Sequence, residues 1–222
     1  MAHNYKAGDE YLDCAIGKSS QPSVFLDSTG RAYTVATHTL PSARGQGEPL
    51  SGRVNPPDGA TFAGAMIGPA DSHWLVTTSA GFGFIVSMAD LISRNRSGKS
   101  VLRVPPQARV NIPGSVSEDE GSQVVAASSE GRLLCFPIEE LPHLARGKGN
   151  KILGIPTARF KSGEESMVDA IVIGSRAKLQ VCCGKRVMTL KAKDLEKYRG
   201  TRGRRGALLP RGWRKVDQLR IA

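Results

Sequence analysis

The sequence predicts an all-β protein, a propeller-like ring of blades, and two observations lead to this fold class. Four segments show the pattern of a β-hairpin: an apolar or β-branched run, a short polar turn that ends in glycine, and an alternating run. The turn glycines are Gly30, Gly81, Gly131 and Gly184, which lie 51, 50 and 53 residues apart. Unrelated hairpins would not keep such a period, so we interpret them as four copies of one unit. A repeat of about 50 residues with four short strands has the size of a propeller blade.

Each copy continues beyond its hairpin in the same order. A leucine follows the second strand, at Leu40, Leu91, Leu141 and Leu195. A loop rich in glycine and basic residues comes next, and three residues after its last glycine an apolar side chain predicts a short strand, at Leu50, Val101, Ile152 and Leu209. Apolar runs such as 65–68, 170–174 and 218–221 then predict a closing strand. The segments 91–93, 141–144 and 195–198 show no alternation, so short helical turns fit there.

The repeats set the expected domain organisation, which is a single domain from 4 to 222. Its repeats are predicted at about 20–70, 71–120, 121–174 and 175–222. A partial blade at 4–19 is expected before them, because Leu12–Gly17 matches a closing strand that no hairpin precedes. Residues 1–3 are set aside as a candidate cloning remnant. We expect Tyr33, Trp74 and Phe84 to pack inside the blades.

The net charge of +11 is concentrated in the last third of the chain. Residues 1–140 have a net charge of −3 and residues 141–222 a net charge of +14. Such asymmetry indicates a polyanionic partner, nucleic acid first and an anionic membrane surface second. The closing run from Lys197 to Ala222 has the composition of a basic tail, yet it contains apolar residues such as Trp213 and Val216, which a solvated tail does not need. Because this run repeats the loop and strands of the earlier units, we interpret it as folded.

The basic loops are the candidate binding site. Like loops of successive blades lie on the same rim, so they are expected to form an arc of positive charge. Their glycines would let phosphates approach the backbone, and Arg and Lys would neutralise them. The candidate DNA-binding residues of the loops are Arg44, Arg94, Arg96, Lys99, Arg146, Lys148, Lys151, Arg202, Arg204 and Arg205. A second rank outside the loops consists of Lys185, Arg186, Arg211, Arg214 and Lys215.

The strings VFLDSTGRAY, TLPSARGQGEPLSG, AGFGF, ARGKGNKI and RGRRG resemble the C-terminal domain of ParC, the DNA-cleaving protein of bacterial DNA topoisomerase IV, and the likeness runs from about Asn4 to the end. The resemblance implies a β-pinwheel, a propeller-like ring whose blades exchange a strand with their neighbours. It implies that the domain binds and bends double-stranded DNA and delivers it to a catalytic core for decatenation and supercoil relaxation. That core is formed by the N-terminal part of ParC and a separate ATPase protein. The resemblance also implies a bacterial cytoplasmic, nucleoid-associated protein with no membrane partner, and a domain without a cofactor, since ATP and Mg²⁺ are expected only in the rest of the enzyme.

Three other functions stay open at this point. The related gyrase A domain carries the box Q-R-R-G-G-K-G in its first blade, and no such string occurs here; the nearest are 43–47 and 145–149. That departure favours topoisomerase IV over a gyrase-type DNA-wrapping domain. A propeller that uses its basic rim for an acidic protein partner is the second alternative. An RNA or membrane-surface binder that uses the same arc is the third.

Patterns that indicate an enzyme are missing from the sequence. Gly17-Lys18-Ser19 and Gly98-Lys99-Ser100 resemble the end of a phosphate-binding loop, but Leu12 and Ser93 stand where that motif needs its first glycine. The four histidines show no metal-ligand spacing, and the four scattered cysteines fit buried thiols rather than a zinc site or a disulfide framework. The resemblance places the DNA-cleaving tyrosine in an N-terminal region that this sequence does not contain. We therefore predict no catalytic residue and no metal site in this chain.

Overall fold

The computed structural model describes residues 10–42, 47–117 and 119–222, in which fifteen strands form four antiparallel sheets. In order across each sheet, the first contains β3 (Phe62–Ile67), β1 (Pro22–Asp27), β2 (Arg31–Ala36) and β6 (Lys99–Ser100). The second contains β10 (Asn150–Lys151), β5 (Phe82–Ser87), β4 (His73–Thr78) and β7 (Gly114–Val116). The third contains β11 (Met167–Ile173), β8 (Gln123–Ser128), β9 (Arg132–Pro137) and β14 (Ala207–Leu208). The fourth contains β13 (Arg186–Leu190), β12 (Leu179–Cys183) and β15 (Gln218–Ile221).

The four predicted hairpins are confirmed. The pairs β1–β2, β4–β5, β8–β9 and β12–β13 are antiparallel, and each turns at the predicted glycine. These four glycines have φ values of 81°, 84°, 71° and 59°, a region that L side chains rarely adopt. At Gly30 the space is closed as well, because a Cβ would overlap the carbonyl of Leu102. The period seen in the sequence is therefore a period of turns that require glycine.

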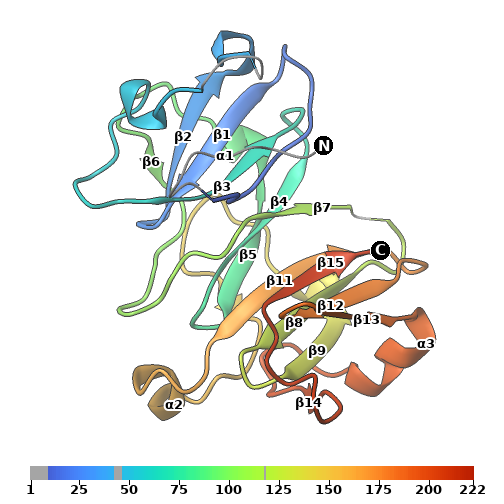
Figure 1. The fold of residues 1–222 in the computed structure, drawn as a ribbon. Helices are drawn as coiled ribbons and strands as arrows, with labels where there is room; N and C mark the ends of the chain where they lie inside the picture. Colours follow the sequence, from blue (N-terminus) through green and yellow to red (C-terminus); the bar gives the residue numbers. More distant parts are fainter. Residues whose placement is uncertain (1–9, 43–46, 118) are drawn as a thin grey trace.

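Each outer edge strand of the first three sheets comes from the following repeat. β6 belongs to the second basic loop yet pairs with β2, β10 belongs to the third and pairs with β5, and β14 belongs to the fourth and pairs with β9. Figure 1 shows the resulting chain of sheets, with the first near the top, the second in the middle, and the third and fourth in the lower half. This exchange of strands between neighbours is that of a β-pinwheel, so the predicted fold is confirmed.

One predicted strand is wrong. The strand expected at Leu50 is absent, and Leu50 instead begins the 3-10 turn η2 (Leu50–Gly52). The equivalent two-residue strands of the later loops each pair with the preceding blade, whereas residues 47–50 pair with no strand of the described chain. Pro49, which has no N–H to donate, precedes this turn.

Hydrophobic side chains fill the spaces between successive sheets. Leu26 and Met66 of the first blade pack with Val76 and Phe84 of the second, and similar clusters join the second blade to the third and the third to the fourth. Tyr33 lies in a smaller cluster on the other face of the first blade. The predicted burial of Tyr33, Trp74 and Phe84 is confirmed.

Helices are short and lie between the strands. They are η1 (Thr37–Thr39), η2, α1 (Met88–Leu91), η3 (Ile138–Glu140), α2 (Thr157–Lys161), α3 (Ala192–Leu195) and η4 (Glu196–Tyr198). Of the segments expected to form helical turns, 195–198 does so as η4. The turns α1 and η3 instead begin directly after the second hairpin strand, about three residues earlier than expected.

The first described residues form no regular strand. Asp13 lies beside β3, where its carboxylate accepts a hydrogen bond from Ala65 N (3.0 Å). Cys14 is exposed, which corrects the expectation of four buried thiols, whereas Cys135, Cys182 and Cys183 are buried. The partition of the sequence into a partial blade and four repeats stays a prediction.

Candidate nucleic-acid interface

The second and third basic loops, 94–99 and 145–151, are joined by backbone hydrogen bonds. Gly147 N donates to Val101 O (2.8 Å), just after the strand that the second loop contributes. In return Gly147 O accepts a hydrogen bond from Arg103 N (2.8 Å). This reciprocal pair fixes one loop against the next.

The third and fourth loops, the latter at 202–206, repeat the arrangement. Gly203 N donates to Ile152 O (2.9 Å), and Arg204 O accepts from Gly154 N (2.8 Å). At the other end, the backbone of the second loop accepts a hydrogen bond from Asn55 N of the first repeat (2.8 Å). The described loops therefore follow one another along a continuous arc of backbone.

Glycine allows these loops to lie directly on the preceding blade. Gly98, Gly149 and Gly206 stand just before the exchanged strands, with φ values of 61°, 73° and 73°. At Gly149, for example, a Cβ would overlap the carbonyl of Gly83, so only glycine fits. Backbone contacts thus hold the loops against the ring, which fixes the positions from which their basic side chains extend.

Side chains at the start of the second hairpin strand also hold the loops. Arg31 donates to Ser97 O (2.8 Å) and Gly98 O (3.0 Å) of the second loop, and Arg132 donates to Gly206 O (3.1 Å) of the fourth. In the second blade this position is Phe82. Here the loop supplies the cation, because the Lys148 ammonium of the third loop lies 4.1 Å from the centre of the Phe82 ring.

The fourth blade lacks an exchanged strand among the described residues, and the arginine at the same position makes different contacts. Arg186 donates to Gly212 O, and its guanidinium lies 4.9 Å from the centre of the Trp213 ring. Position rather than composition could have identified these anchors, since Arg31 and Arg132 directly follow the turn glycine and Arg186 follows it by two residues, and each begins the second hairpin strand.

Eight of the predicted binding residues make no side-chain hydrogen bond, ion pair or cation–π contact within the described chain. Arg94, Arg146 and Arg204 are exposed on three successive loops. Lys99 and Lys151 are half-buried in the exchanged strands. The other three, Lys185, Arg211 and Lys215, are exposed in the fourth repeat. The arc therefore places at least one uncommitted cation on each of the second, third and fourth loops.

Other predicted residues already hold the fold together. Arg96 donates to Gly52 O (2.8 Å) and Arg53 O (2.9 Å), and the half-buried Arg202 donates to Lys151 O (2.9 Å). These two arginines link neighbouring loops.

Two further predicted arginines bind within the third and fourth repeats. Arg205 pairs with the buried Glu165 at 2.6 Å, and Arg214 donates to Leu209 O at 3.3 Å. Arg44 lies outside the described residues.

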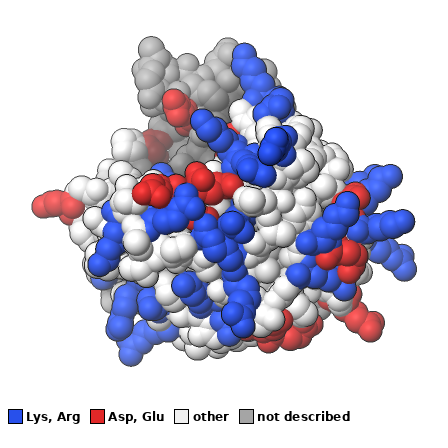
Figure 2. Space-filling model, turned by 90° about the horizontal axis from the view of Figure 1, so that it is seen from below, with Lys and Arg blue, Asp and Glu red and all other residues white. Residues whose placement is uncertain are grey.

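Lys and Arg cover much of one face of the molecule. Figure 2 shows this face with basic side chains in several bands and smaller acidic groups set among them. Sequence reasoning missed Arg103 and Arg159, because neither lies within a glycine-rich loop. Arg103 is exposed beside Gly147 and shares a cleft of about 370 Å³ with Arg146. For Arg103 the available signal was its place five residues after Gly98, whereas Arg159 stands ten residues after Gly149 and no such signal marked it.

The titratable groups of the interior do not suggest catalysis. Tyr33 donates a hydrogen bond to Asp27 Oδ2 (2.7 Å), and burial together with this bond raises its pKa to about 12. Burial likewise raises the pKa of Cys135 to about 12, so neither group is an anionic nucleophile near neutral pH. In the described ranges, no three His, Cys, Asp or Glu side chains come together as a metal site. None of the described helices is long and apolar enough to cross a membrane.

Comparison with known proteins gives the family. The model of the DNA gyrase C-terminal domain, beta-propeller family, matches residues 72–110 and 122–173. The solved Escherichia coli ParC C-terminal domain is 43% identical, with a TM-score of 0.84 over 99% of this chain and 88% of that one. The chain belongs to the ParC C-terminal domain family.

Two further proteins, one more and one less similar in sequence, share this region. The A subunit of DNA topoisomerase 4 from Pseudomonas aeruginosa is 47% identical over 98% of the chain, which spans 29% of that relative's length. A solved DNA gyrase A C-terminal domain is only 15% identical, with a TM-score of 0.74 over 100% of this chain and 72% of that one, and shares the fold.

Proposed function

We propose that this ParC-type domain binds duplex DNA through its phosphates along the arc of basic loops and bends it. In this role it is an accessory domain of a type II topoisomerase. It presents duplex segments to a catalytic core, made of the N-terminal part of ParC and the ATPase protein of the holoenzyme, for decatenation and supercoil relaxation. ATP and Mg²⁺ act in that core, and the enzyme works on the bacterial nucleoid in the cytoplasm.

The observation that carries the proposal is the continuity of the arc. Backbone hydrogen bonds hold successive loops in place, and each of the second, third and fourth loops carries an exposed arginine, at Arg94, Arg146 and Arg204. Cations at fixed separations suit a polyanion with a regular charge spacing, which is what a duplex backbone presents. Contacts of this kind position DNA and carry no base readout.

Bending follows from the shape of the ring. The loops lie on the rim of successive blades, so a duplex that contacts several of them must follow a curve. Smooth bending of a 20–30 bp segment costs about 1–6 kcal/mol, which a few phosphate contacts can offset.

Binding and circularisation together test the proposal. The 222-residue chain is titrated against labelled random duplex DNA, duplex RNA and anionic vesicles at one salt concentration, with and without an acidic competitor protein. Ligation of a duplex shorter than about 150 bp, the persistence length of DNA, then measures bending. We expect preferred binding to duplex DNA and faster circularisation. Stronger binding to RNA, vesicles or the acidic protein, or DNA binding without any gain in circularisation, would overturn the corresponding part.

A further inference from the structure

A basic cleft lies where the fourth loop meets the hairpin turn of the third blade. Its volume is about 320 Å³. The lining residues are Ser129, Glu130, Arg132, Arg159, Arg205, Leu208, Arg214 and Lys215. Five of these eight are basic and one is acidic, and none is aromatic. Such a lining suits the anionic phosphates of a nucleic-acid backbone, to which most protein–DNA hydrogen bonds are made.

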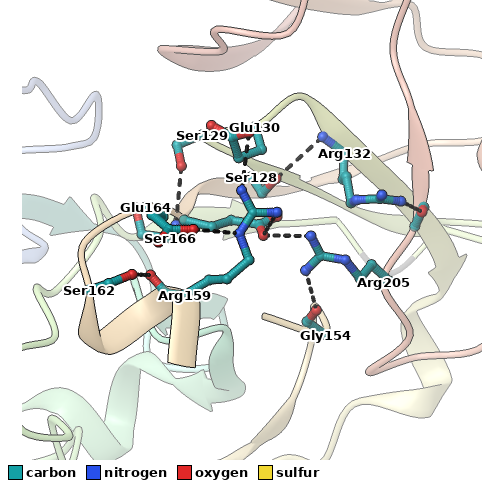
Figure 3. A network of polar contacts seen from close by, with 12 residues as sticks. Ser128, Ser129, Glu130, Arg132, Gly154, Arg159, Ser162, Glu164, Ser166 and Arg205 are labelled. Atoms are coloured by element: carbon teal, nitrogen blue, oxygen red, sulfur yellow. Dashed lines mark hydrogen bonds and ion pairs between the residues drawn. The ribbon is translucent and has the colours of Figure 1, made fainter. Parts of the chain in front are cut away.

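A buried carboxylate beneath the cleft orients two of its arginines. Glu165 has a side chain that is 0% exposed, and its Oε2 lies 2.6 Å from Arg205 and 3.6 Å from Arg159. Figure 3 shows these two arginines converging from α2 and from the loop before β14. A buried charge requires such partners, so Glu165 fixes both guanidinium groups in place. Glu164 also pairs with Arg159, with its Oε2 3.2 Å from Arg159 Nε, so counting Glu130, Glu164 and Glu165 the cleft keeps a net charge of +2.

The contact between Arg159 and Glu130, at the edge of the cleft, differs from the buried pair. Glu130 is in the hairpin turn between β8 and β9, with a side chain that is 48% exposed, and it accepts a hydrogen bond from Arg159 Nη2 at 3.4 Å. Exposed pairs of this length contribute little to stability. An incoming anion can therefore replace Glu130 on Arg159 without loss of the buried pair below.

We propose that this cleft is a phosphate-binding site for the backbone of duplex DNA and that Glu130 occupies Arg159 when no DNA is bound. The inference rests on the proposed function, and it extends the arc of contacts beyond the fourth loop. The phosphate takes the place of the Glu130 carboxylate on Arg159, and Lys215 and Arg214 also line the cleft. Glu130 thus lowers the affinity for DNA until it is displaced.

A double-mutant cycle tests this site in the 222-residue chain. The variants are Glu130→Gln, Arg159→Gln and the two combined, with Glu139→Gln as a control that removes an exposed carboxylate outside the cleft. Affinity for a labelled random duplex is measured as a function of salt. We expect Glu130→Gln to tighten binding by up to about five-fold, the range of one exposed ion pair. Its plot of log K against log salt should keep its slope, because the same phosphate is bound in both chains, whereas Arg159→Gln should flatten the slope by about 0.9, one phosphate fewer.

The combined variant decides between displacement and general electrostatics. If Glu130 acts by occupying Arg159, Glu130→Gln gives no gain in the Arg159→Gln background, and Glu139→Gln gives little gain anywhere. An equal gain in both backgrounds would overturn the proposal.

A second probe is needed because Arg159→Gln also removes a partner of buried Glu165. Lys215→Gln serves this purpose: the exposed Lys215 side chain makes no polar contact with described residues, so this variant removes a charge from the cleft without removing a partner of Glu165. If Lys215→Gln and Arg159→Gln both bind DNA as the unaltered chain does, the cleft is not a phosphate site, although the arc of loops still binds DNA. Failure of the unaltered chain to bind duplex DNA would instead refute the proposed function itself.

Discussion

The exposed arginines of the arc allow a direct test of phosphate binding. Arg94, Arg146 and Arg204 lie on successive loops, and their side chains make no hydrogen bond or ion pair with described residues. Replacing all three by glutamine removes three positive charges without removing a contact that supports the fold. The melting temperature should therefore stay close to that of the unaltered chain.

The size of the effect follows from counterion release. Each phosphate that a protein neutralises contributes about −0.9 to the slope of log K against log salt, so the triple variant should flatten that slope by up to about 2.7. If affinity at about 1 M salt is unchanged, the loss at about 0.1 M then approaches 500-fold. The loss should be the same for different duplex sequences, because phosphates carry no base information.

Fluorescence anisotropy with a labelled duplex, at salt concentrations of about 50–200 mM, measures this slope. The control is the triple variant Arg176→Gln, Lys178→Gln and Lys193→Gln, which removes the same charge from exposed positions outside the loops. A much smaller change is expected for it. Equal losses in the two variants, with both folded, would show that total charge rather than the arc determines binding.

Three further predictions concern the fold and the absent chemistry. Arg205→Ala leaves the buried Glu165 with only the 3.6 Å contact to Arg159, so urea unfolding should show a loss of about 2–4 kcal/mol, and a loss below that of an ordinary surface change would contradict this role. Gly149→Ala should destabilise far more than Gly163→Ala, because both have φ near 75° but only Gly149 lacks room for a Cβ; thermal melting of the pair checks this. The purified chain should neither cleave nor relax supercoiled DNA, with or without ATP and Mg²⁺, and relaxation on agarose gels would contradict the accessory role.

The repeat made most of the strands predictable, but not how the strands of neighbouring blades pair. Turn glycines leave a strong signal because few residues tolerate their φ, and all four appear where the period placed them. The exchanged strands leave a weaker signal, the apolar residue three positions after the last loop glycine, since Lys99–Ser100 and Asn150–Lys151 are two residues long and have no alternation to detect. Their pairing with the preceding blade depends on tertiary structure, and only the family resemblance predicted it.

The same limit applies to the candidate site. Composition places Arg202, Arg204 and Arg205 in one class, yet the structure separates them: Arg204 is exposed, while Arg202 bonds to Lys151 O and Arg205 to Glu165. An alanine substitution of all three would therefore reduce stability and remove charge together.

The pH dependence of the junction between the third and fourth blades gives a last prediction. Asp169 of β11 accepts a hydrogen bond from Leu219 N of β15 (2.8 Å), and burial raises its pKa from 3.8 to about 6, against the opposing effect of the backbone bonds. Because the folded chain holds this proton more tightly than the unfolded chain, the stabilisation is complete below about pH 4 and is lost as pH rises through about 6. Asp169→Asn lacks this titration, so its stability relative to the unaltered chain should rise by about 1–3 kcal/mol between those pH values. Urea unfolding of both chains at several pH values measures the difference, and a difference that stays constant across this window would show that the carboxylate is not desolvated at the junction.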